Sequence, residues 1–276
     1  MRDIRLIAMD MDGTLLNGAH ETTSYTRDVL RRAASAGIAL ALCTGRCLSE
    51  LKEHLENLPM VRYVVAENGG CLYDVKARRI VRQIALAPET TEAALCALQS
   101  YDVILQAFLR NQSYMQCRSD QDLTPWHIQD FLPVFRSGSV FVDDLAARCL
   151  AEPGAVEKIN AYFTSDQEKE RFRRESDGFA ARRMDSIGVG FELSPLEASK
   201  GAGLNALCAH LGISPANAMA IGDGDNDVDM MRAAGIAVAM GNAIGAVKRL
   251  SAAVTDDCDH DGAAKAIERL ALGEAL

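Results

Sequence analysis

Short apolar runs, each ending at a polar or glycine-rich segment, are the feature that most constrains the fold of this chain. The first run is Ile4–Met9, followed by Asp10, and the second is Ile38–Cys43, followed by Thr44. A third run, Ala218–Ile221, leads into a loop rich in glycine and aspartate. Nearly continuous apolar runs of this length are typical of strands buried on both faces of a parallel sheet.

The segment between the first two runs favours parallel pairing of their strands. Ser24–Ala36 carries apolar residues at helical spacing and stops at Gly37, a residue that commonly follows the end of a helix. A strand, a helix and a strand in this order form a right-handed βαβ unit, in which the two strands are parallel. Open α/β sheets bind ligands at the carboxyl ends of such strands, so we expect Asp10 and Thr44 at one ligand-binding edge.

Further segments extend this predicted sheet. A helix at Leu48–Asn57 leads to a strand at Tyr63–Ala66, and Cys71–Ile84 is predicted to form a hairpin. The alternation of strands and helices returns at Gly190–Leu193, which we expect to rejoin the same sheet.

The middle of the chain has a different rhythm. Helices and short strands, among them a predicted strand at Tyr114–Cys117, follow an α+β pattern there. The sequence therefore predicts an α/β fold with two domains. A Rossmann-like, mostly parallel core would comprise residues 1–84 and 188–276, and an inserted α+β domain would comprise residues 85–187.

Composition excludes several classes of protein. The 276 residues are 49% hydrophobic and 24% charged, which is ordinary for a globular protein. A net charge of −9 argues against nonspecific binding to nucleic acid, because such binding depends on Lys and Arg contacts with phosphates. Charges of both signs alternate along Gln167–Arg174 and indicate a solvated helix face.

Cysteine spacing and hydropathy bear on the compartment. The eight cysteines form no Cys-x-x-Cys pair and no cluster with zinc-ligand spacing, which favours reduced, structural thiols. No segment approaches the roughly 18 consecutive apolar residues of a membrane span, and the amino terminus lacks the apolar region of a signal peptide. We expect a cytoplasmic protein, a monomer or small homo-oligomer, with no nucleic-acid or membrane partner.

Carboxylates are concentrated at the predicted strand ends. Clustered carboxylates repel one another and indicate a bound divalent cation, and oxygen ligands without His or Cys favour Mg²⁺. A lysine and a hydroxyl beside such a cation suit a phosphoryl group. The polar residues expected at this edge are Asp10, Asp12, Thr44, Lys200, Asp223, Asn226 and Asp227.

Other interpretations of these segments are weaker. Asp-Gly-Thr is common in simple turns, so the first acidic pair alone carries little weight. The loop from Asp223 resembles a calcium loop in its alternating aspartates, but it has Val228 where such a loop needs Gly and Ala234 where it needs Glu. No G-x-G-x-x-G follows a predicted strand, which argues against dinucleotide binding.

Four motifs together resemble those of the haloacid dehalogenase superfamily of phosphatases. They are D-x-D-G-T from Asp10, C-T-G-R from Cys43, S-K-G from Ser199, and G-D-G-D-N-D-V-D-M from Gly222. The insert between the second and third motifs resembles the large α+β (type IIB) cap of the Cof-type branch. The resemblance covers nearly the whole chain.

The resemblance implies the chemistry of the acidic residues. Asp10 would be a nucleophile that forms an aspartyl-phosphate. Asp12 would protonate the leaving oxygen and then deprotonate the attacking water. Mg²⁺ would be held by the Asp10 carboxylate, the Asp12 backbone carbonyl and Asp223.

The resemblance also implies a binding site for the phosphoryl oxygens. Thr44, Gly45, Lys200 and Asn226 would contact them, and Asp227 would orient the metal ligands or the lysine. Two further residues at strand ends, Arg46 and Asn68, are candidates for substrate contact or for simple turn caps.

The sequence thus predicts a Mg²⁺-dependent phosphatase of small phosphorylated metabolites, with sugar phosphates as the first candidates. Pyridoxal phosphate and flavin mononucleotide are further candidates. A phosphomutase would use the same aspartyl-phosphate, and a sensor would bind a phosphorylated ligand without turnover. The motifs handle the phosphoryl group and leave the rest of the substrate open.

Overall fold

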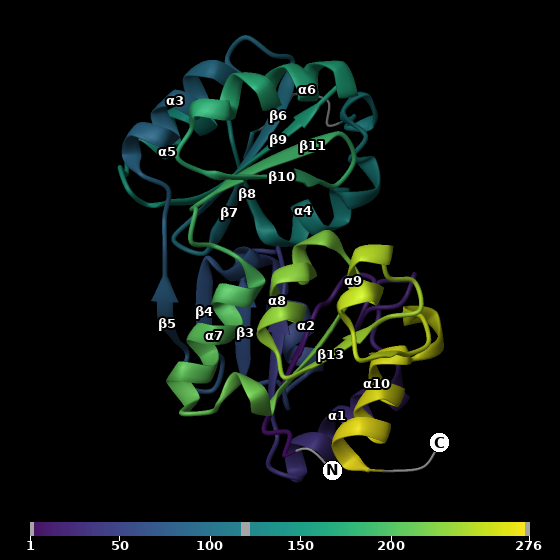
Figure 1. The fold of residues 1–276 in the computed structure, drawn as a ribbon. Helices are drawn as coiled ribbons and strands as arrows, with labels where there is room; N and C mark the ends of the chain where they lie inside the picture. Colours follow the sequence, from purple (N-terminus) through teal and green to yellow (C-terminus); the bar gives the residue numbers. More distant parts are fainter. Residues whose placement is uncertain (1–2, 117–121, 274–276) are drawn as a thin grey trace. The chain divides into compact units, whose positions relative to one another are not determined.

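The structure is a computed structural model that describes residues 3–116 and 122–273. These residues form two compact units (Figure 1). Among the described residues, the core unit consists of residues 3–45, 54–83 and 199–273, and the second unit consists of residues 46–53, 84–116 and 122–198.

The core unit is built on an eight-stranded sheet. Its strands are β1 (Leu6–Met9), β2 (Ala39–Cys43), β3 (Tyr63–Ala66), β4 (Cys71–Asp74), β5 (Arg79–Gln83), β12 (Ala218–Gly222), β13 (Ile236–Ala239) and β14 (Ala253–Val254). The strand order is β14-β13-β12-β1-β2-β3-β4-β5. Neighbours from β14 to β3 are parallel, whereas β3–β4 and β4–β5 are antiparallel. The predicted mostly parallel sheet is confirmed.

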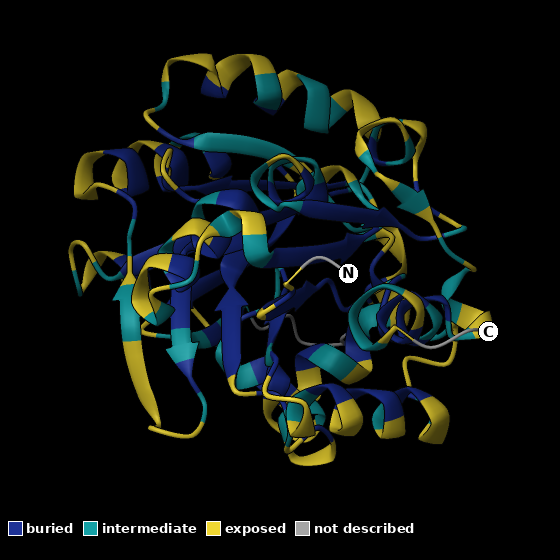
Figure 2. Ribbon diagram, turned by 60° about the horizontal axis from the view of Figure 1, so that its bottom comes forward, coloured by how far each residue is buried: buried dark blue, intermediate teal, exposed yellow. Residues whose placement is uncertain are grey.

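Two groups of helices flank this sheet. The helices of the core unit are α1 (Ser24–Ser35), α2 (Lys52–Asn57), α7 (Lys200–Leu211), α8 (Val228–Ala233), α9 (Gly245–Leu250) and α10 (Gly262–Ile267). The helices α7, α8 and α9 pack in series, and α1 packs against α10. Figure 2 shows that the strands between them are buried along most of their length.

Local sequence explains where the helices of the core unit begin and end. The Thr23 side chain accepts a hydrogen bond from the Thr26 N–H and caps α1. Ser199 caps α7 in the same way by accepting from Ala202 N–H, and Gly212 ends α7 with φ +64°. Strand β1, whose four residues are all buried, lies between two parallel neighbours and places the residue after Met9 at the carboxyl edge of the sheet.

The second unit is built on a six-stranded sheet in the order β10-β11-β9-β6-β7-β8. The strands are β6 (Val103–Leu109), β7 (Gln112–Gln116), β8 (Ser139–Val142), β9 (Val156–Phe163), β10 (Arg182–Ser186) and β11 (Gly190–Ser194), and the helices are α3 (Pro88–Leu98), α4 (Leu132–Gly138), α5 (Leu145–Leu150) and α6 (Asp166–Glu175). All neighbouring strands are antiparallel except β7 and β8, which are parallel. This is an α+β arrangement, with α3, α5 and α6 on one face of the sheet (Figure 1).

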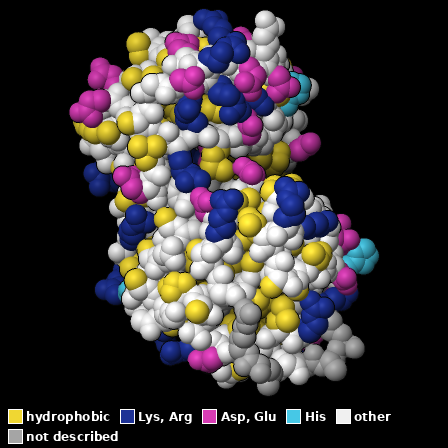
Figure 3. All heavy atoms as spheres, in the orientation of Figure 1, with side chains coloured by type: hydrophobic (Ala, Val, Ile, Leu, Met, Phe, Trp, Pro, Cys, Tyr) yellow, Lys and Arg dark blue, Asp and Glu magenta, His cyan; other side chains and the backbone are white. Residues whose placement is uncertain are grey.

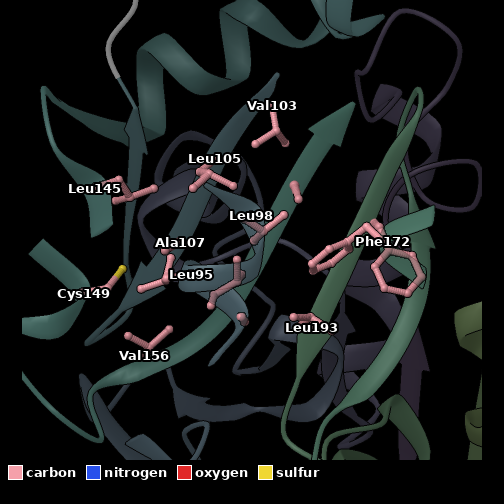
Figure 4. Close-up of a cluster of buried hydrophobic side chains, with 14 of the residues drawn as sticks. Leu95, Leu98, Val103, Leu105, Ala107, Leu145, Cys149, Val156, Phe172 and Leu193 are labelled. Atoms are coloured by element: carbon pink, nitrogen blue, oxygen red, sulfur yellow. The ribbon is translucent and has the colours of Figure 1, made fainter. Parts of the chain in front are cut away.

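Apolar side chains fill the space between this sheet and α3, α5 and α6 (Figure 4). Leu95 and Leu98 of α3 belong to the same apolar cluster as Leu105 of β6, and Phe172 of α6 packs edge-on against Phe191 of β11. On α6, Phe172 is the buried residue of a helix whose other side chains are largely charged. Charges of both signs are interspersed over the face of the molecule in Figure 3.

One sequence-based strand assignment is wrong. Gly190–Leu193 was expected to rejoin the parallel sheet, but β11 pairs antiparallel with β9 and β10 in the second unit. Its side chains alternate, with Phe191 and Leu193 in the apolar cluster and Glu192 on the other face, which is typical of an antiparallel strand. The core unit therefore resumes at Ser199 and not at residue 188.

A second assignment also needs correction. The single helix expected at Leu48–Asn57 is a 3₁₀ turn, η1 (Leu48–Leu51), followed by α2. Residues 46–53 belong to the second unit, because Ser49 Oγ accepts from Ser113 N–H at 3.0 Å and Glu50 Oε1 accepts from Gln106 Nε2 at 2.8 Å. Side-chain hydrogen bonds to β6 and β7 therefore tie this 3₁₀ turn to the second unit.

Cysteine pairing and membrane crossing can be assessed over residues 3–116 and 122–273. The cysteines there are all free, in agreement with the prediction of reduced thiols, and Cys117 lies outside the described residues. Cys117 also ends the strand predicted at Tyr114–Cys117, which corresponds to β7. None of the described helices has both the length and the apolarity that a membrane crossing requires.

Candidate active site

Three neighbouring strands of the core sheet end beside one another. Strand β1 pairs in parallel with β12 on one side and with β2 on the other. Asp10 follows β1, Thr44 follows β2 and Asp223 follows β12. The predicted meeting of these residues at one edge is therefore present, although Asp10 and Asp223 are 213 residues apart in the sequence.

At this edge, the Lys200 side chain contacts two carboxylates. Its Nζ lies 2.5 Å from Asp10 Oδ1 and 2.7 Å from Asp227 Oδ1, and its side chain is 0% exposed. It is the first residue of α7, a position that is unfavourable for a cation in the field of the helix. The negative charges of the two carboxylates offset the unfavourable field of the helix, and they hold the ammonium group inside the site.

The path of the backbone allows α7 to begin this close to the sheet. Gly69, in the 3₁₀ turn η2 (Glu67–Gly69) after β3, has φ +95°, and a Cβ there would lie 2.0 Å from Ser199 O. A side chain at position 69 would push away the residue that caps α7. The glycine therefore helps to place Lys200.

Burial and charged neighbours both shift the pKa values of the side chains in this cluster. Burial, followed by the charge of Asp227, raises the pKa of Asp10 well above its usual value, and Lys200 counters part of that rise. Burial alone would lower the pKa of Lys200, but Asp10 and Asp227 outweigh it and leave that pKa raised. Burial also raises the pKa of Asp223, against the hydrogen bond from Thr14. The cluster thus has more negative charge than its lysine neutralises, which favours an additional cation.

The acidic side chains are close enough to share a cation. Ligand atoms of Asp10, Asp223 and Asp227 all lie within 4.8 Å of one another. Asp227 is already engaged, because its Oδ2 accepts from the N–H groups of Asp223 and Gly224 at 2.9 and 3.0 Å. Asp10 and Asp223 are therefore the better cation ligands, and an all-oxygen donor set fits a hard divalent ion.

A second group of polar residues lies at the ends of β2 and β3. Asn226 Nδ2 donates to Asn68 Oδ1 at 3.1 Å, and Asn68 N–H donates to Thr44 O at 2.9 Å. A Cβ on Gly45 would lie 3.3 Å from the Asn68 amide. The structure therefore brings together Thr44, Gly45, Asn68 and Asn226, and it assigns Arg46 to the second unit.

Asp12 differs from its acidic neighbours in exposure. Its side chain is 45% exposed, and its Oδ1 lies 3.8 Å from His20 Nδ1. Met11, between the two aspartates, is fully buried. Asp12 is therefore accessible to water, whereas Asp10 and Met11 are buried.

Two residues of the site were missed from the sequence. Thr14 Oγ1 donates to Asp223 Oδ1 at 2.9 Å, and Asn242 Nδ2 lies 3.2 Å from Asp223 Oδ2. Asn242 follows β13, which is parallel to β12. The rule that strand ends meet at one edge could therefore have indicated Asn242, had it been applied to this strand as well.

Residues 7–267 match the family model of the haloacid dehalogenase-like hydrolases. The chain belongs to this family. It is 29% identical over 294 residues to phosphatase YwpJ of Bacillus subtilis (strain 168), covering 97% of this chain and 100% of that protein. It is 30% identical over 251 residues to an HMP-PP phosphatase of Cronobacter sakazakii (strain ATCC BAA-894), covering 87% of this chain and 85% of that one.

The fold agrees with the same family. The HAD subclass IIB sugar phosphatase BT4131 superposes with a TM-score of 0.82 at 21% identity, covering 97% of this chain and 99% of that chain. The predicted family, the α/β fold with a cap domain and the enzyme class, a phosphatase, are confirmed. The second unit contains the cap.

Proposed function

We propose that this protein is a Mg²⁺-dependent phosphatase that hydrolyses small phosphorylated metabolites through an aspartyl-phosphate on Asp10. The observation that supports this most is the fully buried Lys200 ammonium, in contact with Asp10 and Asp227. A buried cation at the first residue of α7, beside carboxylates whose charge exceeds its own, suits an anionic substrate bound together with a metal ion.

In the first step, a carboxylate oxygen of Asp10 attacks phosphorus and forms the Asp10–phosphorus bond. The bond between phosphorus and the leaving oxygen breaks. Asp12, as a carboxylic acid, gives its proton to that oxygen and becomes a carboxylate. The exposure of the Asp12 side chain supports this role, because an acid/base must reach both the leaving group and water.

In the second step, the Asp12 carboxylate takes a proton from a water molecule, whose oxygen attacks phosphorus. The bond between phosphorus and Asp10 breaks, and inorganic phosphate leaves. Asp12 is again protonated and Asp10 is again a carboxylate, so the cycle closes without another reactant.

Positive charge and hydrogen-bond donors would stabilise the transferring phosphoryl group. The residues proposed to contact it are Thr44, Gly45, Lys200 and Asn226. Mg²⁺, held by the Asp10 and Asp223 carboxylates and the Asp12 backbone carbonyl, would supply positive charge to the site. Asp227 would hold Lys200 in place, and Arg46 and Asn68 remain candidates for substrate contact.

Sugar phosphates are the first substrate class to test, and phosphorylated cofactors or their precursors are the second. Two relatives at 28 to 30% identity are named as an HMP-PP phosphatase and a 5-amino-6-(5-phospho-D-ribitylamino)uracil phosphatase, so these two phosphorylated compounds belong in the panel as well. Release of inorganic phosphate from a metabolite panel, ranked by kcat/KM, would identify the class.

The reaction itself can be tested with p-nitrophenyl phosphate. We expect Asp10→Asn to lower kcat by at least about 10³-fold, because an amide oxygen is a poor nucleophile. Asp225→Asn is a matched control, since Asp225 is an exposed acid in the same loop as Asp223. Chelation of Mg²⁺ should abolish hydrolysis, and added Mg²⁺ should restore it. Wild-type rates for Asp10→Asn, or for the chelated enzyme, would refute the mechanism.

The same panel separates the two alternatives. A phosphomutase would convert a sugar monophosphate into an isomeric monophosphate and release little free phosphate. A sensor would bind a phosphorylated ligand and release none.

A further inference from the structure

The loop between β13 and α9 is tied to the loop that carries Asp223. Met240 N–H donates to Gly222 O at 3.1 Å, and Ile244 N–H donates to Asp223 O at 3.0 Å. These backbone contacts lie on either side of Asn242. They fix the position of Asn242 relative to Asp223 without involving its side chain.

The Asn242 side chain joins three segments of the core unit. Its Nδ2 donates to Gly13 O at 2.8 Å and to Asp223 Oδ2 at 3.2 Å, and its Oδ1 accepts from Cys258 N–H at 3.2 Å. The chemistry of these partners fixes the amide orientation, because the first two are acceptors and the third is a donor. Asn242 therefore connects the Asp10–Thr14 loop, Asp223 and the carboxyl-terminal loop.

Asp223 consequently has a donor on each oxygen. Thr14 Oγ1 donates to Oδ1 and Asn242 Nδ2 donates to Oδ2. The backbone of Gly13 passes so close that a Cβ there would lie 2.6 Å from Asp223 Oδ2. A carboxylate held from both sides keeps one orientation, so its remaining lone pairs point in fixed directions.

We propose that Asn242 is a positioning residue that orients the Asp223 carboxylate for a divalent cation and holds it against the Asp10–Thr14 loop. The proposal rests on the cation site of the proposed function. It assigns to Asn242 an effect on cation affinity and none on the chemical steps. Loss of the side chain should weaken the binding of the cation and leave the rate of the loaded enzyme nearly unchanged.

The test is equilibrium binding of Mn²⁺ to the full chain without substrate, followed by electron paramagnetic resonance, with Mg²⁺ activation of p-nitrophenyl phosphate hydrolysis measured in parallel. We expect Asn242→Ala to raise the Kd for Mn²⁺ and the Mg²⁺ activation constant by about tenfold, as is typical for a residue that orients a metal ligand. At saturating Mg²⁺, kcat should return to within about twofold of wild type.

Asn217→Ala is the matched control. Asn217 Nδ2 also donates to a backbone carbonyl, Asp3 O at 2.6 Å, and approaches a carboxylate, Asp3 Oδ2 at 3.5 Å, but it lies before β12, at the strand end opposite to Asp223. We expect its Kd for Mn²⁺ to equal that of wild type. Asn242→Ser, which keeps a small polar group, should fall between Asn242→Ala and wild type, and it is the variant to use if Asn242→Ala does not fold.

Several outcomes would overturn the inference. An unchanged Kd for Mn²⁺ in both Asn242 variants would exclude a role in cation binding. A fall in kcat that saturating Mg²⁺ does not restore would assign Asn242 to catalysis or to folding. If the wild-type protein bound no Mn²⁺, the cation site of the proposed function would fall as well, so the two failures are distinguishable.

Discussion

Both sheets of the protein bury polar side chains, but they place them differently. In the core unit a buried ionic cluster of Asp10, Lys200 and Asp227 lies at the edge where the parallel strands end. In the second unit a buried network of mostly neutral side chains lies in the middle of strands. Gln106 of β6 is the centre of that network, and it bonds to Glu50, Ser113, Asn160 and Tyr162.

The difference shows what each arrangement can do. A side chain in mid-strand is flanked by the side chains of neighbouring strands, which satisfy it and fix it. A side chain at a strand end meets loop backbone and helix termini, so part of its hydrogen-bonding capacity can be directed to a ligand. We therefore assign reactivity to the strand-end cluster and structural stabilisation to the network of the second unit.

The largest expected effect comes from comparing two buried lysines. Lys200→Met should lower kcat/KM for p-nitrophenyl phosphate by about 10³-fold or more, because it removes the cation beside Asp10. Lys158 of β9 is 4% exposed and pairs with Glu192, so Lys158→Met is a matched control. Its activity should stay within about fivefold of wild type, whereas its stability should fall, since Glu192 would lose its partner. Equal losses of activity would contradict the comparison.

A smaller effect is expected when the network of the second unit is broken. Gln106→Leu removes four hydrogen bonds and leaves the buried Glu50 carboxylate without its amide donor, so we expect the unfolding free energy to fall by about 2–4 kcal/mol. Trp126 lies in the second unit and is the one tryptophan of the sequence, so its fluorescence during urea unfolding reports on that unit. Gln99→Leu, at an exposed glutamine after α3, is the control. A change below about 0.5 kcal/mol in Gln106→Leu would show that the network is not structural.

The same contrast explains what the sequence could predict. Asp10, Thr44 and Asp223 each follow an apolar run, so the strand-end rule brought them to one edge without knowledge of side-chain contacts. The rule failed at Gly190–Leu193, because a short apolar segment with one acid does not show whether its strand is parallel or antiparallel until its neighbours are known. Gln106 was not predicted, since a single polar residue inside Val103–Leu109 carries no local sign of partners that lie up to 56 residues away.

Ion pairs also occur in the core unit outside the strand-end cluster, and they should behave as structural contacts. Glu268, which follows α10, accepts hydrogen bonds from the Tyr25 hydroxyl and from Arg32 of α1. Burial would raise the pKa of Glu268, but these two donors outweigh it and lower the pKa below its usual value. The carboxylate thus stabilises the fold above the unfolded-state pKa of about 4.3, and this contribution is lost as the pH falls through the lower folded-state pKa.

We therefore expect Glu268→Gln to lower the unfolding free energy at pH 7 by about 1 kcal/mol. The difference from wild type should shrink as the pH falls below about 4, because protonation removes the charge from the wild-type side chain as well. Urea unfolding followed by circular dichroism at several pH values measures this difference. A difference that is the same at pH 7 and pH 3 would mean that the charge of Glu268 contributes nothing. Hydrolysis of p-nitrophenyl phosphate at pH 7 should not change.

The smallest effect is expected from a comparison of two buried hydroxyls. Thr14 is 2% exposed and donates to Asp223, whereas Ser194 is 1% exposed and its Oγ has no hydrogen-bond partner within the described residues. An unpartnered buried hydroxyl does not stabilise a fold, so Ser194→Ala should change the unfolding free energy of the second unit by less than about 0.5 kcal/mol or should raise it slightly.

Thr14→Val, of nearly equal shape, should instead weaken Mg²⁺ activation, because it removes one of the two donors that hold Asp223. If Ser194→Ala lost as much stability as Gln106→Leu, the Ser194 hydroxyl would have to stabilise the second unit, and the mid-strand network would extend to β11.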